Sequence, residues 1–385
     1  MVRDVTGLVV LGSTGSIGRQ TLDVVRALPG RFRVVGLAAG RNIALLRAQI
    51  DEFSPDVVWA APGPDSDALA GELGSERWQP MDEMAARPDV GVVLVATVGT
   101  VGLAPTLAAL EAGNAVALAN KEVLIVGGHW VRAAAIKGGG ELRPVDSEHS
   151  AIWQCLRGEP PGSIDRLTLT ASGGALRNLD IDQLDRVTPE QALRHPNWEM
   201  GPKVTIDSAT LFNKGLEVIE ARWLFDIPVD RIDIVLHRES IVHSLVTFVD
   251  GSVKAQLGEP DMKLPIQCAL TYPERAPEQA LPRLDLAARG SLNFGEVDDS
   301  RFPALGLALE AARREGTYAA ALSGADEAAV EHFLAGRCRF TDIGKLLGQA
   351  LDAHQSRDEP SLDDLLAAEQ WGHRFVEDAV AAGVR

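Results

Sequence analysis

Short apolar runs alternate with helix-forming stretches through the first third of the chain, and no other feature restricts the fold as strongly. Strands that are apolar on both faces are typical of a parallel sheet buried between two layers of helices. We therefore predict an N-terminal α/β domain over residues 1–145, with a doubly wound, Rossmann-type parallel sheet. The expected strands are residues 7–11, 32–38, 56–60, 90–98 and 115–119.

The sequence after this region changes in character. A strand at 141–145 leads into Asp146-Ser147-Glu148, and Asp250-Gly251 is a strong hairpin signal. We predict a central α+β domain with a mixed sheet over 146–270, a proline-rich linker over 271–300 and a C-terminal helical bundle over 301–385. The β-branched stretches are 166–170, 231–236, 241–249 and 252–257, the proline-rich stretch is 273–282, and N-cap signals stand at Thr341-Asp342 and Ser361.

The composition restricts the class of partner. The formal net charge is −17, which argues against a nucleic-acid-binding or membrane-surface protein. The three cysteines form no CxxC motif, so we expect a reducing compartment, with neither a disulfide framework nor a zinc knuckle. No apolar run approaches the length of about 18 residues that a membrane helix needs, and no targeting segment is evident. We expect a cytoplasmic protein that acts on a small molecule.

A glycine-rich turn, GSTGSIG at residues 12–18, stands between the first expected strand and a helix. Glycines let such a turn approach a pyrophosphate, which the helix N-terminus stabilises. The spacing is GxxGxxG rather than GxGxxG, and an ordinary glycine-rich turn is the alternative. The second strand ends in Gly40-Arg41-Asn42, without the Asp or Glu typical of NAD sites. A guanidinium suits a 2′-phosphate, which favours NADP, although a solvated surface arginine is the alternative.

Three carboxylates form a candidate metal site. Asp146 and Glu148 stand at i and i+2 after a strand, and this spacing places both side chains on one face. Glu217, on a later helix, can supply a third oxygen. Oxygen ligands without His or Cys select a hard ion, Mg²⁺ or Mn²⁺. The alternative is a group of ordinary surface acids in an acidic chain; the neighbouring Ser147 and His149 favour the site.

A loop at 195–203 is followed by an expected helix that Asp207 or Ser208 caps. Polar residues at helical spacing share one face of it: Thr210, Asn213, Lys214 and Glu217. Trp198 and Met200 are either core filler or a mobile apolar lid, and the turn-rich loop favours the lid. His195 is a loop donor or an acid–base group, and we favour the donor. Phosphate-type donors are Ser172 with Gly173-Gly174, Ser208, Asn213 and Lys214.

Taken together, these segments resemble the 1-deoxy-D-xylulose 5-phosphate reductoisomerase family over nearly the whole chain. The most specific matches are PVDSEHSAI and RHPNWEMGPKVTIDSATLFNKGLEVIEARWLF, supported by LGSTGSIGRQTLDVV, LANKE and QLGEPDMKLPI. The resemblance implies a homodimeric, metal-dependent enzyme. It would use NADPH to isomerise and reduce 1-deoxy-D-xylulose 5-phosphate to 2-C-methyl-D-erythritol 4-phosphate, in isoprenoid precursor biosynthesis.

The resemblance also implies residue roles. NADPH contacts fall on Thr14, Gly15, Ser16, Ile17, Gly40, Arg41, Asn42, Asn120, Glu122 and Gly201. The metal ligands are Asp146, Glu148 and Glu217, which with Lys121 form the catalytic set. Substrate contacts fall on Lys121, Ser147, Glu148, Ser172, His195, Trp198, Ser208, Asn213, Lys214 and Glu217. The central domain would then carry the metal site and a flexible flap that contains Trp198 and Met200.

The chain departs from the family pattern in three places and leaves rival functions open. Ala175 follows Gly174 where proline is usual, Arg238 replaces a proline, and ALSGADEA at 321–328 replaces an ALNAANE-like pattern. A plain NADP-dependent sugar- or semialdehyde-phosphate dehydrogenase would explain the glycine turn but not the three carboxylates. An inactive NADP-sensing scaffold is the non-enzymatic alternative. The route of rearrangement, retro-aldol/aldol or α-ketol, stays open, as does the preferred metal.

Overall fold

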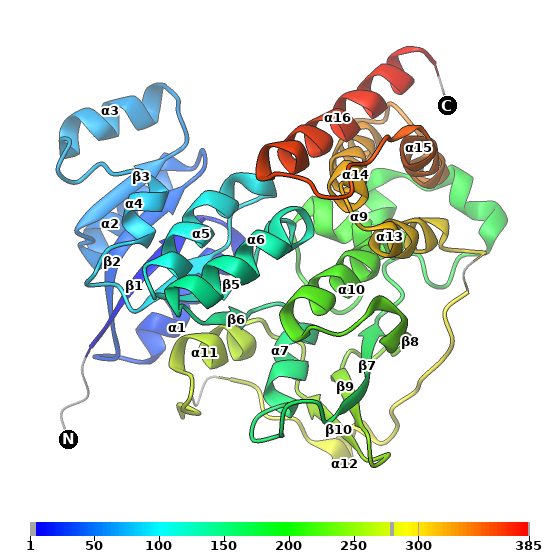
Figure 1. Cartoon of the computed structure of the whole chain (residues 1–385), viewed down its shortest axis with the longest axis horizontal. Coiled ribbons are helices and arrows are strands. Elements are labelled where there is room, and N and C mark those ends of the chain that lie inside the picture. Colours follow the sequence, from blue (N-terminus) through cyan, green and yellow to red (C-terminus); the bar gives the residue numbers. More distant parts are fainter. Residues whose placement is uncertain (1–4, 278–280, 299, 384–385) are drawn as a thin grey trace. The chain divides into compact units, whose positions relative to one another are not determined.

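The computed structural model describes residues 5–277, 281–298 and 300–383 (Figure 1). The chain forms two compact units, and it passes between them more than once. The first unit comprises residues up to 123, 128–150 and 261–282, and the second comprises 124–127, 151–260 and the chain from 283 onward. Of the expected linker, residues 278–280 and 299 lie outside the described residues. The four-part division by function stays a prediction.

The first unit holds a six-stranded, fully parallel sheet, which confirms the predicted Rossmann-type fold. Its order is β3-β2-β1-β4-β5-β6, so the direction of winding reverses between β1 and β4. The strands are β1 (Thr6–Leu11), β2 (Phe32–Ala39), β3 (Val57–Ala60), β4 (Val92–Val95), β5 (Ala115–Leu118) and β6 (Leu142–Pro144).

Helices pack on this sheet because its strands are apolar on both faces. One of them, α11, comes from far along the sequence, and its Ile266 and Leu270 are buried in the same core as Leu8 and Val10. The helices are α1 (Ser16–Ala27), α2 (Ile43–Phe53), α3 (Pro64–Leu73), α4 (Met81–Ala85), α5 (Leu103–Glu111), α6 (Glu122–Gly138) and α11 (Lys263–Thr271), with a 3₁₀ turn at Gly99–Gly102. Residues 124–127 of α6 belong to the second unit, and α7 (Ser147–Cys155) crosses the boundary at residue 150.

The second unit holds the predicted mixed sheet, in the order β10-β9-β7-β8. β7 pairs parallel with β8 and antiparallel with β9, and β9 and β10 form the antiparallel hairpin that Asp250-Gly251 predicts. The strands are β7 (Ile164–Ala171), β8 (Ile232–Leu236), β9 (Val242–Phe248) and β10 (Val253–Leu257). Short helices are Ile181–Arg186, α8 (Pro189–Ala192), Val229–Arg231 and α12 (Leu286–Arg289).

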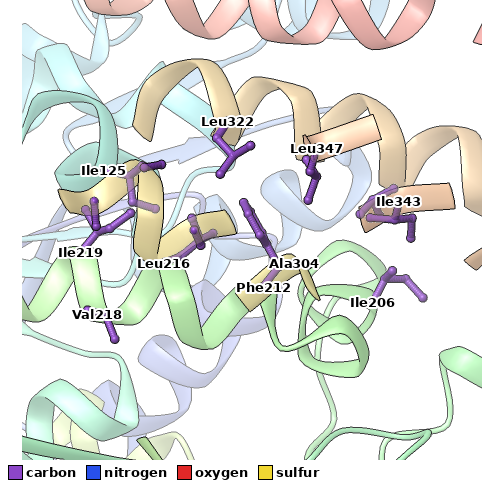
Figure 2. Close-up of a cluster of buried hydrophobic side chains, with 14 of the residues drawn as sticks. Ile125, Ile206, Phe212, Leu216, Val218, Ile219, Ala304, Leu322, Ile343 and Leu347 are labelled. Carbon is purple, nitrogen blue, oxygen red and sulfur yellow. The ribbon is translucent and has the colours of Figure 1, made fainter. Parts of the chain in front are cut away.

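The long helices of the second unit share one apolar core, shown in Figure 2. Phe212 and Leu216 of α10 lie in the same buried cluster as Leu322 and Leu347 from the C-terminal helices. The C-terminal helices therefore complete the core of the second unit. The helices are α9 (Pro202–Thr210), α10 (Phe212–Phe225), α13 (Pro303–Arg314), α14 (Tyr318–Leu334), α15 (Phe340–Ala353) and α16 (Leu362–Ala381).

Of the two predicted helix starts, one is confirmed and the other is wrong. Ser361 caps α16 through the Asp364 N–H, as predicted. The prediction at Thr341-Asp342 is wrong, because α15 already begins at Phe340 and Asp342 lies in its first turn, where it accepts from the Arg339 N–H. Within the described residues, no helix combines the length and the apolar composition needed to cross a bilayer.

The single helix predicted after residue 206 is two helices. Leu211 adopts a left-handed conformation with φ of 59°, which ends α9 and begins α10. Asp207 and Ser208 therefore lie inside α9 rather than at an N-cap, and Thr210 does not share the α10 face of Asn213, Lys214 and Glu217. The prediction failed because neither glycine nor proline marks the break, and Leu211 is held by burial in an apolar cluster instead.

Candidate functional site

The glycine-rich turn lies between β1 and α1 and is built for close backbone approach. Gly12 has φ of 89°, and a Cβ there would overlap the Ala96 carbonyl oxygen. A Cβ at Gly18 would overlap the Gly12 carbonyl oxygen, so both positions require glycine. Gly15 forms the N-cap of α1 without a side-chain hydrogen bond. The first-turn N–H groups can therefore face an anion, which fits the dinucleotide prediction for Thr14, Gly15, Ser16 and Ile17.

The end of β2 lies directly beside this turn, because the N–H groups of Gly12 and Ser13 both donate to Ala38 O at 2.8 Å. Gly40, Arg41 and Asn42 follow and are exposed. Asn42 caps α2 through the Leu45 N–H at 3.1 Å, which leaves Arg41 as the charged group at the turn. This arrangement fits the prediction of a 2′-phosphate contact.

Further predicted residues lie at the carboxyl ends of β5 and β6. Asn120 is buried and donates to Thr97 O at 2.9 Å and Gly99 O at 2.8 Å, which ties the β4 and β5 loops together. Its Oδ1 also accepts from Val123 N in the first turn of α6, which begins at Glu122 with Lys121 as its N-cap. Carboxyl strand ends beside the reversal of winding are where ligands bind in such sheets.

Lys121 and Asp146 form a partly buried ion pair in the first unit. The distance from Lys121 Nζ to Asp146 Oδ2 is 2.8 Å, and Asp146 Oδ1 accepts from the Ser147 N–H. Ser147 Oγ donates to Glu148 Oε2 at 2.6 Å. The predicted strand geometry of Asp146 and Glu148 is wrong: β6 ends at Pro144, and Glu148 lies in the first turn of α7. The turn still supplies carboxylate oxygens together with an ammonium and a hydroxyl group.

Asn213, Lys214 and Glu217 form a second charged group, on α10. Glu217 is 1% exposed; its Oε1 accepts from Asn213 Nδ2 and its Oε2 contacts Lys214 Nζ, each at 2.5 Å. The spacings i+3 and i+4 make these contacts possible on one helix face. The sequence prediction that these three residues share a face is confirmed by the fold. A buried carboxylate with two donors is a fixed acceptor, and the ammonium beside it suits an anion.

His195 and Ser172 lie within hydrogen-bonding distance, with Nε2 and Oγ 3.0 Å apart. His195 Nδ1 accepts from the backbone N–H groups of Asn197 and Trp198, at 3.2 and 2.9 Å. Because Nδ1 is the acceptor, Nε2 carries the hydrogen and donates to Ser172 Oγ. Burial, with a contribution from the Arg177 charge, lowers the pKa of His195 to about 4. His195 is therefore a neutral donor at neutral pH, rather than an acid–base group.

Arg177, which no sequence motif indicates, fixes the loop at Ser172. Its guanidinium donates to Ser172 O and to Arg238 O, each at 3.0 Å. Burial, followed by the nearby Arg238 charge, lowers the pKa of Arg177. Arg238, one of the departures from the family pattern, thus adds positive charge beside Arg177, and it donates to Asn178 Oδ1. No spacing pattern in the sequence signalled this pair.

The loop from 195 to 201, called the lid loop below, is pinned at one end and ends at Gly201, the exposed N-cap of α9. Trp198, the predicted lid residue, lies with its ring centroid 6.0 Å from that of His243, a buried histidine of β9. Ser208 lies inside α9, where Gly174 packs against its carbonyl oxygen so closely that a Cβ at residue 174 would overlap it. The loop containing Ser172 and the helix containing Ser208 are thus in direct contact.

Three family models match the chain. Residues 8–128 match "1-deoxy-D-xylulose 5-phosphate reductoisomerase", residues 142–225 match its C-terminal domain, and residues 257–375 match "DXP reductoisomerase C-terminal domain". A curated relative, 1-deoxy-D-xylulose 5-phosphate reductoisomerase of Geobacillus sp. (strain WCH70), is 49% identical over 372 residues, which covers 95% of this chain and 98% of the relative.

Two solved structures are similar over nearly the full length. A DOX-P reductoisomerase in complex with NADPH, fosmidomycin and magnesium is 38% identical, with a TM-score of 0.91 and 98% of each chain covered. The 1-deoxy-D-xylulose 5-phosphate reductoisomerase from Zymomonas mobilis in complex with NADPH is 36% identical, with a TM-score of 0.89, covering 98% of this chain and 99% of that one.

Proposed function

Because this chain belongs to the 1-deoxy-D-xylulose 5-phosphate reductoisomerase family, we propose that it converts 1-deoxy-D-xylulose 5-phosphate to 2-C-methyl-D-erythritol 4-phosphate. The conversion is an isomerisation followed by an NADPH-linked reduction, depends on a divalent cation and belongs to isoprenoid precursor biosynthesis. The observations that carry the proposal beyond family membership are two donor groups, the Ser172–His195 pair and Lys214 beside Glu217, which suit a phosphorylated substrate in an acidic protein.

NADPH fits the turn between β1 and α1. The required glycines at residues 12 and 18 bring backbone N–H groups to the surface, and Arg41 stands exposed beside them. We assign the pyrophosphate to Thr14–Ile17 and the 2′-phosphate to Gly40–Asn42. Asn120, Glu122 and Gly201 complete the proposed cofactor contacts.

A divalent cation fits the carboxylates, because Asp146, Glu148 and Glu217 offer oxygen atoms and no competing sulfur ligand. When bound, such an ion polarises the substrate carbonyl and lowers the pKa of an adjacent hydroxyl. Hydrogen-bond donors hold two of these carboxylates in place: Lys121 stabilises Asp146, and Asn213 with Lys214 stabilises Glu217.

The remaining site residues bind and orient the substrate. Ser172 accepts from His195 and from the Gly174 N–H, so its own hydroxyl hydrogen is available for a phosphate oxygen. We assign the phosphate to Ser172, Ser208, Asn213 and Lys214, with His195 holding Ser172 in place. Binding energy from the remote phosphate can close the lid loop over the substrate and exclude water. Trp198 would form that cover, while Lys121 and Ser147 contact the reacting oxygens.

The decisive test follows NADPH absorbance with 1-deoxy-D-xylulose 5-phosphate and Mg²⁺ or Mn²⁺, with and without a chelator. We expect NADPH oxidation that stops when the chelator is added and resumes when excess cation is restored. Oxidation that is indifferent to the chelator would favour the plain dehydrogenase. NADPH binding with no oxidation under any condition would favour the inactive scaffold. The same assay ranks Mg²⁺ against Mn²⁺.

Two finer assignments complete the proposal. A cytoplasmic location is consistent with the wide spacing of the three cysteines, Cys155, Cys268 and Cys338, along the sequence. A homodimer is expected from the family resemblance, and light scattering of the purified protein measures it directly.

A further inference from the structure

Three charged side chains at the contact of α9 and α14 have no part in the site described above. Lys203 Nζ lies 2.6 Å from Asp207 Oδ2, one turn later on α9, and 2.9 Å from Asp326 Oδ2 on α14. Asp207 is 1% exposed and Asp326 is 0% exposed. One ammonium balances only one carboxylate, so a second ionised carboxylate here would be a buried, uncompensated charge.

Carboxylate oxygen atoms without a hydrogen-bond partner point to a shared proton. Within the described part of the chain, these are Asp207 Oδ1 and both Asp326 oxygens, although Asp326 Oδ2 lies at ion-pair distance from Lys203 Nζ. A buried carboxylate oxygen that accepts no hydrogen bond destabilises the folded state. A proton shared between two carboxyl groups removes this cost, because the protonated group donates a hydrogen bond that the other group accepts. Burial raises the pKa of Asp326 well above its ordinary range, Asp207 raises it further, and Lys203 opposes the shift. Asp326 is therefore the neutral member.

Helices α13, α15 and α16 also pack against α14. The charged groups that act on Asp326 are Lys203 and Asp207, both on α9. Ion pairs of the other helices lie apart from this group: Asp342 pairs with Lys345 on α15, Arg314 pairs with Glu310 on α13, and His373 of α16 lies near Glu331 and Glu377.

We propose that Lys203, Asp207 and Asp326 form a proton-sharing clamp that fixes α9 on α14 and thereby positions Ser208 and the end of the lid loop. Lys203 stands two residues after Gly201, so the clamp holds α9 close to the end of the lid loop. Asp207 precedes Ser208, whose carbonyl oxygen packs against Gly174. The three are positioning residues. Their effect on substrate binding rests on the proposed function, but the shared proton does not.

Replacing Asp326 by asparagine separates the neutral hydrogen-bonding group from its titration. Asparagine has the shape of a protonated aspartate and one hydrogen-bond donor in the same place, but it cannot ionise. Asp326→Asn is therefore the conservative variant that keeps the proposed contact and removes its titration.

The first experiment measures the melting temperature of the full-length protein from about pH 5 to about pH 8. Below the unfolded-state pKa of about 3.9, protonated Asp326 contributes its full stability, and this is lost as pH rises through the raised folded-state pKa. Asp326→Asn has no proton to lose. The melting temperature of the variant should therefore rise relative to that of wild type by about 1–3 °C per pH unit in this window. The exposed control Asp352→Asn should run parallel to wild type.

The second experiment measures KM. Lys203→Met leaves two carboxyl groups without an ammonium, and the displaced α9 should raise KM for the sugar phosphate about 10-fold. KM for NADPH should change less than KM for the sugar phosphate, because the proposed cofactor contacts other than Gly201 lie in the other unit. Adding Asp207→Asn to Lys203→Met removes the surplus negative charge and should restore most of the lost affinity.

Each result bears on one part of the proposal. A pH-independent difference between Asp326→Asn and wild type overturns the shared proton, and that measurement uses no substrate. Unchanged KM in Lys203→Met, or a double variant no better than the single one, overturns the positioning role. If Lys203→Met does not fold, Lys203→Gln takes its place in the same comparison. A protein that lacks the reductoisomerase activity but shows the pH-dependent difference would refute the proposed function and keep the clamp.

Discussion

His195 has two nitrogen atoms with separate tasks. Nδ1 organises the lid loop by accepting from Asn197 N and Trp198 N, while Nε2 orients Ser172. Both tasks need the neutral ring, and burial supplies it by lowering the pKa to about 4. The prediction that His195 is a loop donor rather than an acid–base group is therefore supported by its surroundings, and its contact with substrate stays a proposal.

Replacing His195 separates these tasks. His195→Asn keeps an acceptor near Asn197 N but loses the donor to Ser172, so KM for the sugar phosphate should rise about 3- to 10-fold with little change in kcat. A folded-state pKa below the ordinary 6.5 means that His195 contributes stability above about pH 6.5, which is lost as pH falls toward about 4. The melting temperature of wild type should therefore drop relative to the variant over that range. His129 is exposed, so the control His129→Asn should show neither the rise in KM nor the change in melting temperature. Equal behaviour of the two variants would contradict the assignment of His195 as the donor to Ser172.

Arg41 determines the choice of cofactor in our proposal. Arg41→Asp replaces the group that suits a 2′-phosphate with one that suits ribose hydroxyls, so the kcat/KM ratio for NADPH over NADH should fall at least about 10-fold. Arg19→Asp, on the exposed side of α1, is the matched charge change. An unaltered ratio in Arg41→Asp, or an equal fall in both variants, would remove Arg41 from the cofactor site.

At the scale of elements, the site depends on helices that approach each other closely. Gly215 of α10 packs on Ala308 of α13, and a Cβ at residue 215 would overlap the Ala308 Cβ. Gly215 stands between Lys214 and Leu216 in the sequence. One side of α10 therefore carries the charged Lys214, while the adjacent Gly215 fixes the position of the helix against α13. Helix packing at this distance is set by the smallest side chains in the contact.

Gly215→Ala should therefore destabilise the protein by about 1–3 kcal/mol and raise KM for the sugar phosphate, because α10 must move. Gly306→Ala is the control: residue 306 lies on the neighbouring helix with open space around a new Cβ, and there the change should be neutral or stabilising by up to about 1 kcal/mol. Combining Gly215→Ala with Ala308→Gly removes the overlap and should recover the affinity. Failure of this recovery, measured by calorimetry and kinetics, would show that the crossing does not position Lys214.

At the scale of the molecule, two units divide the proposed tasks. The first holds the glycine-rich turn and the Lys121–Asp146 pair, and the second holds the phosphate-binding donors and Glu217. Segments distant in sequence build each unit, such as α11 in the first and α13–α16 in the second (Figure 1). A variant in one unit should therefore leave the binding function of the other intact.

Glu217→Gln tests this division. Turnover should fall about 100-fold or more and lose its normal response to Mg²⁺, while the dissociation constant for NADPH stays within about twofold of wild type. Isothermal titration with NADPH alone, next to the turnover assay, makes the comparison. Glu310→Gln, an exposed glutamate on α13, serves as control. Normal turnover in Glu217→Gln would exclude Glu217 from the ligand set.

The sequence by itself determined the features that short stretches encode. Apolar runs specified buried parallel strands, Asp250-Gly251 specified the hairpin, and the order of glycines specified the turn between β1 and α1. Helical spacing placed Asn213, Lys214 and Glu217 together, because residues three and four apart always meet on a helix. Local geometry alone is sufficient for all of these.

Only the tertiary structure decided the features that depend on contacts between distant segments. Leu211 breaks the helix because burial compensates a left-handed backbone, and no local residue signals this. Three further features depend on contacts that the fold creates. They are the packing of α11 in the first unit, the hydrogen bond from Arg177 to Ser172 O, and the Lys203–Asp207–Asp326 group. Hydrophobic burial and desolvation act on whatever the fold brings together, so these outcomes follow from packing rather than from sequence spacing.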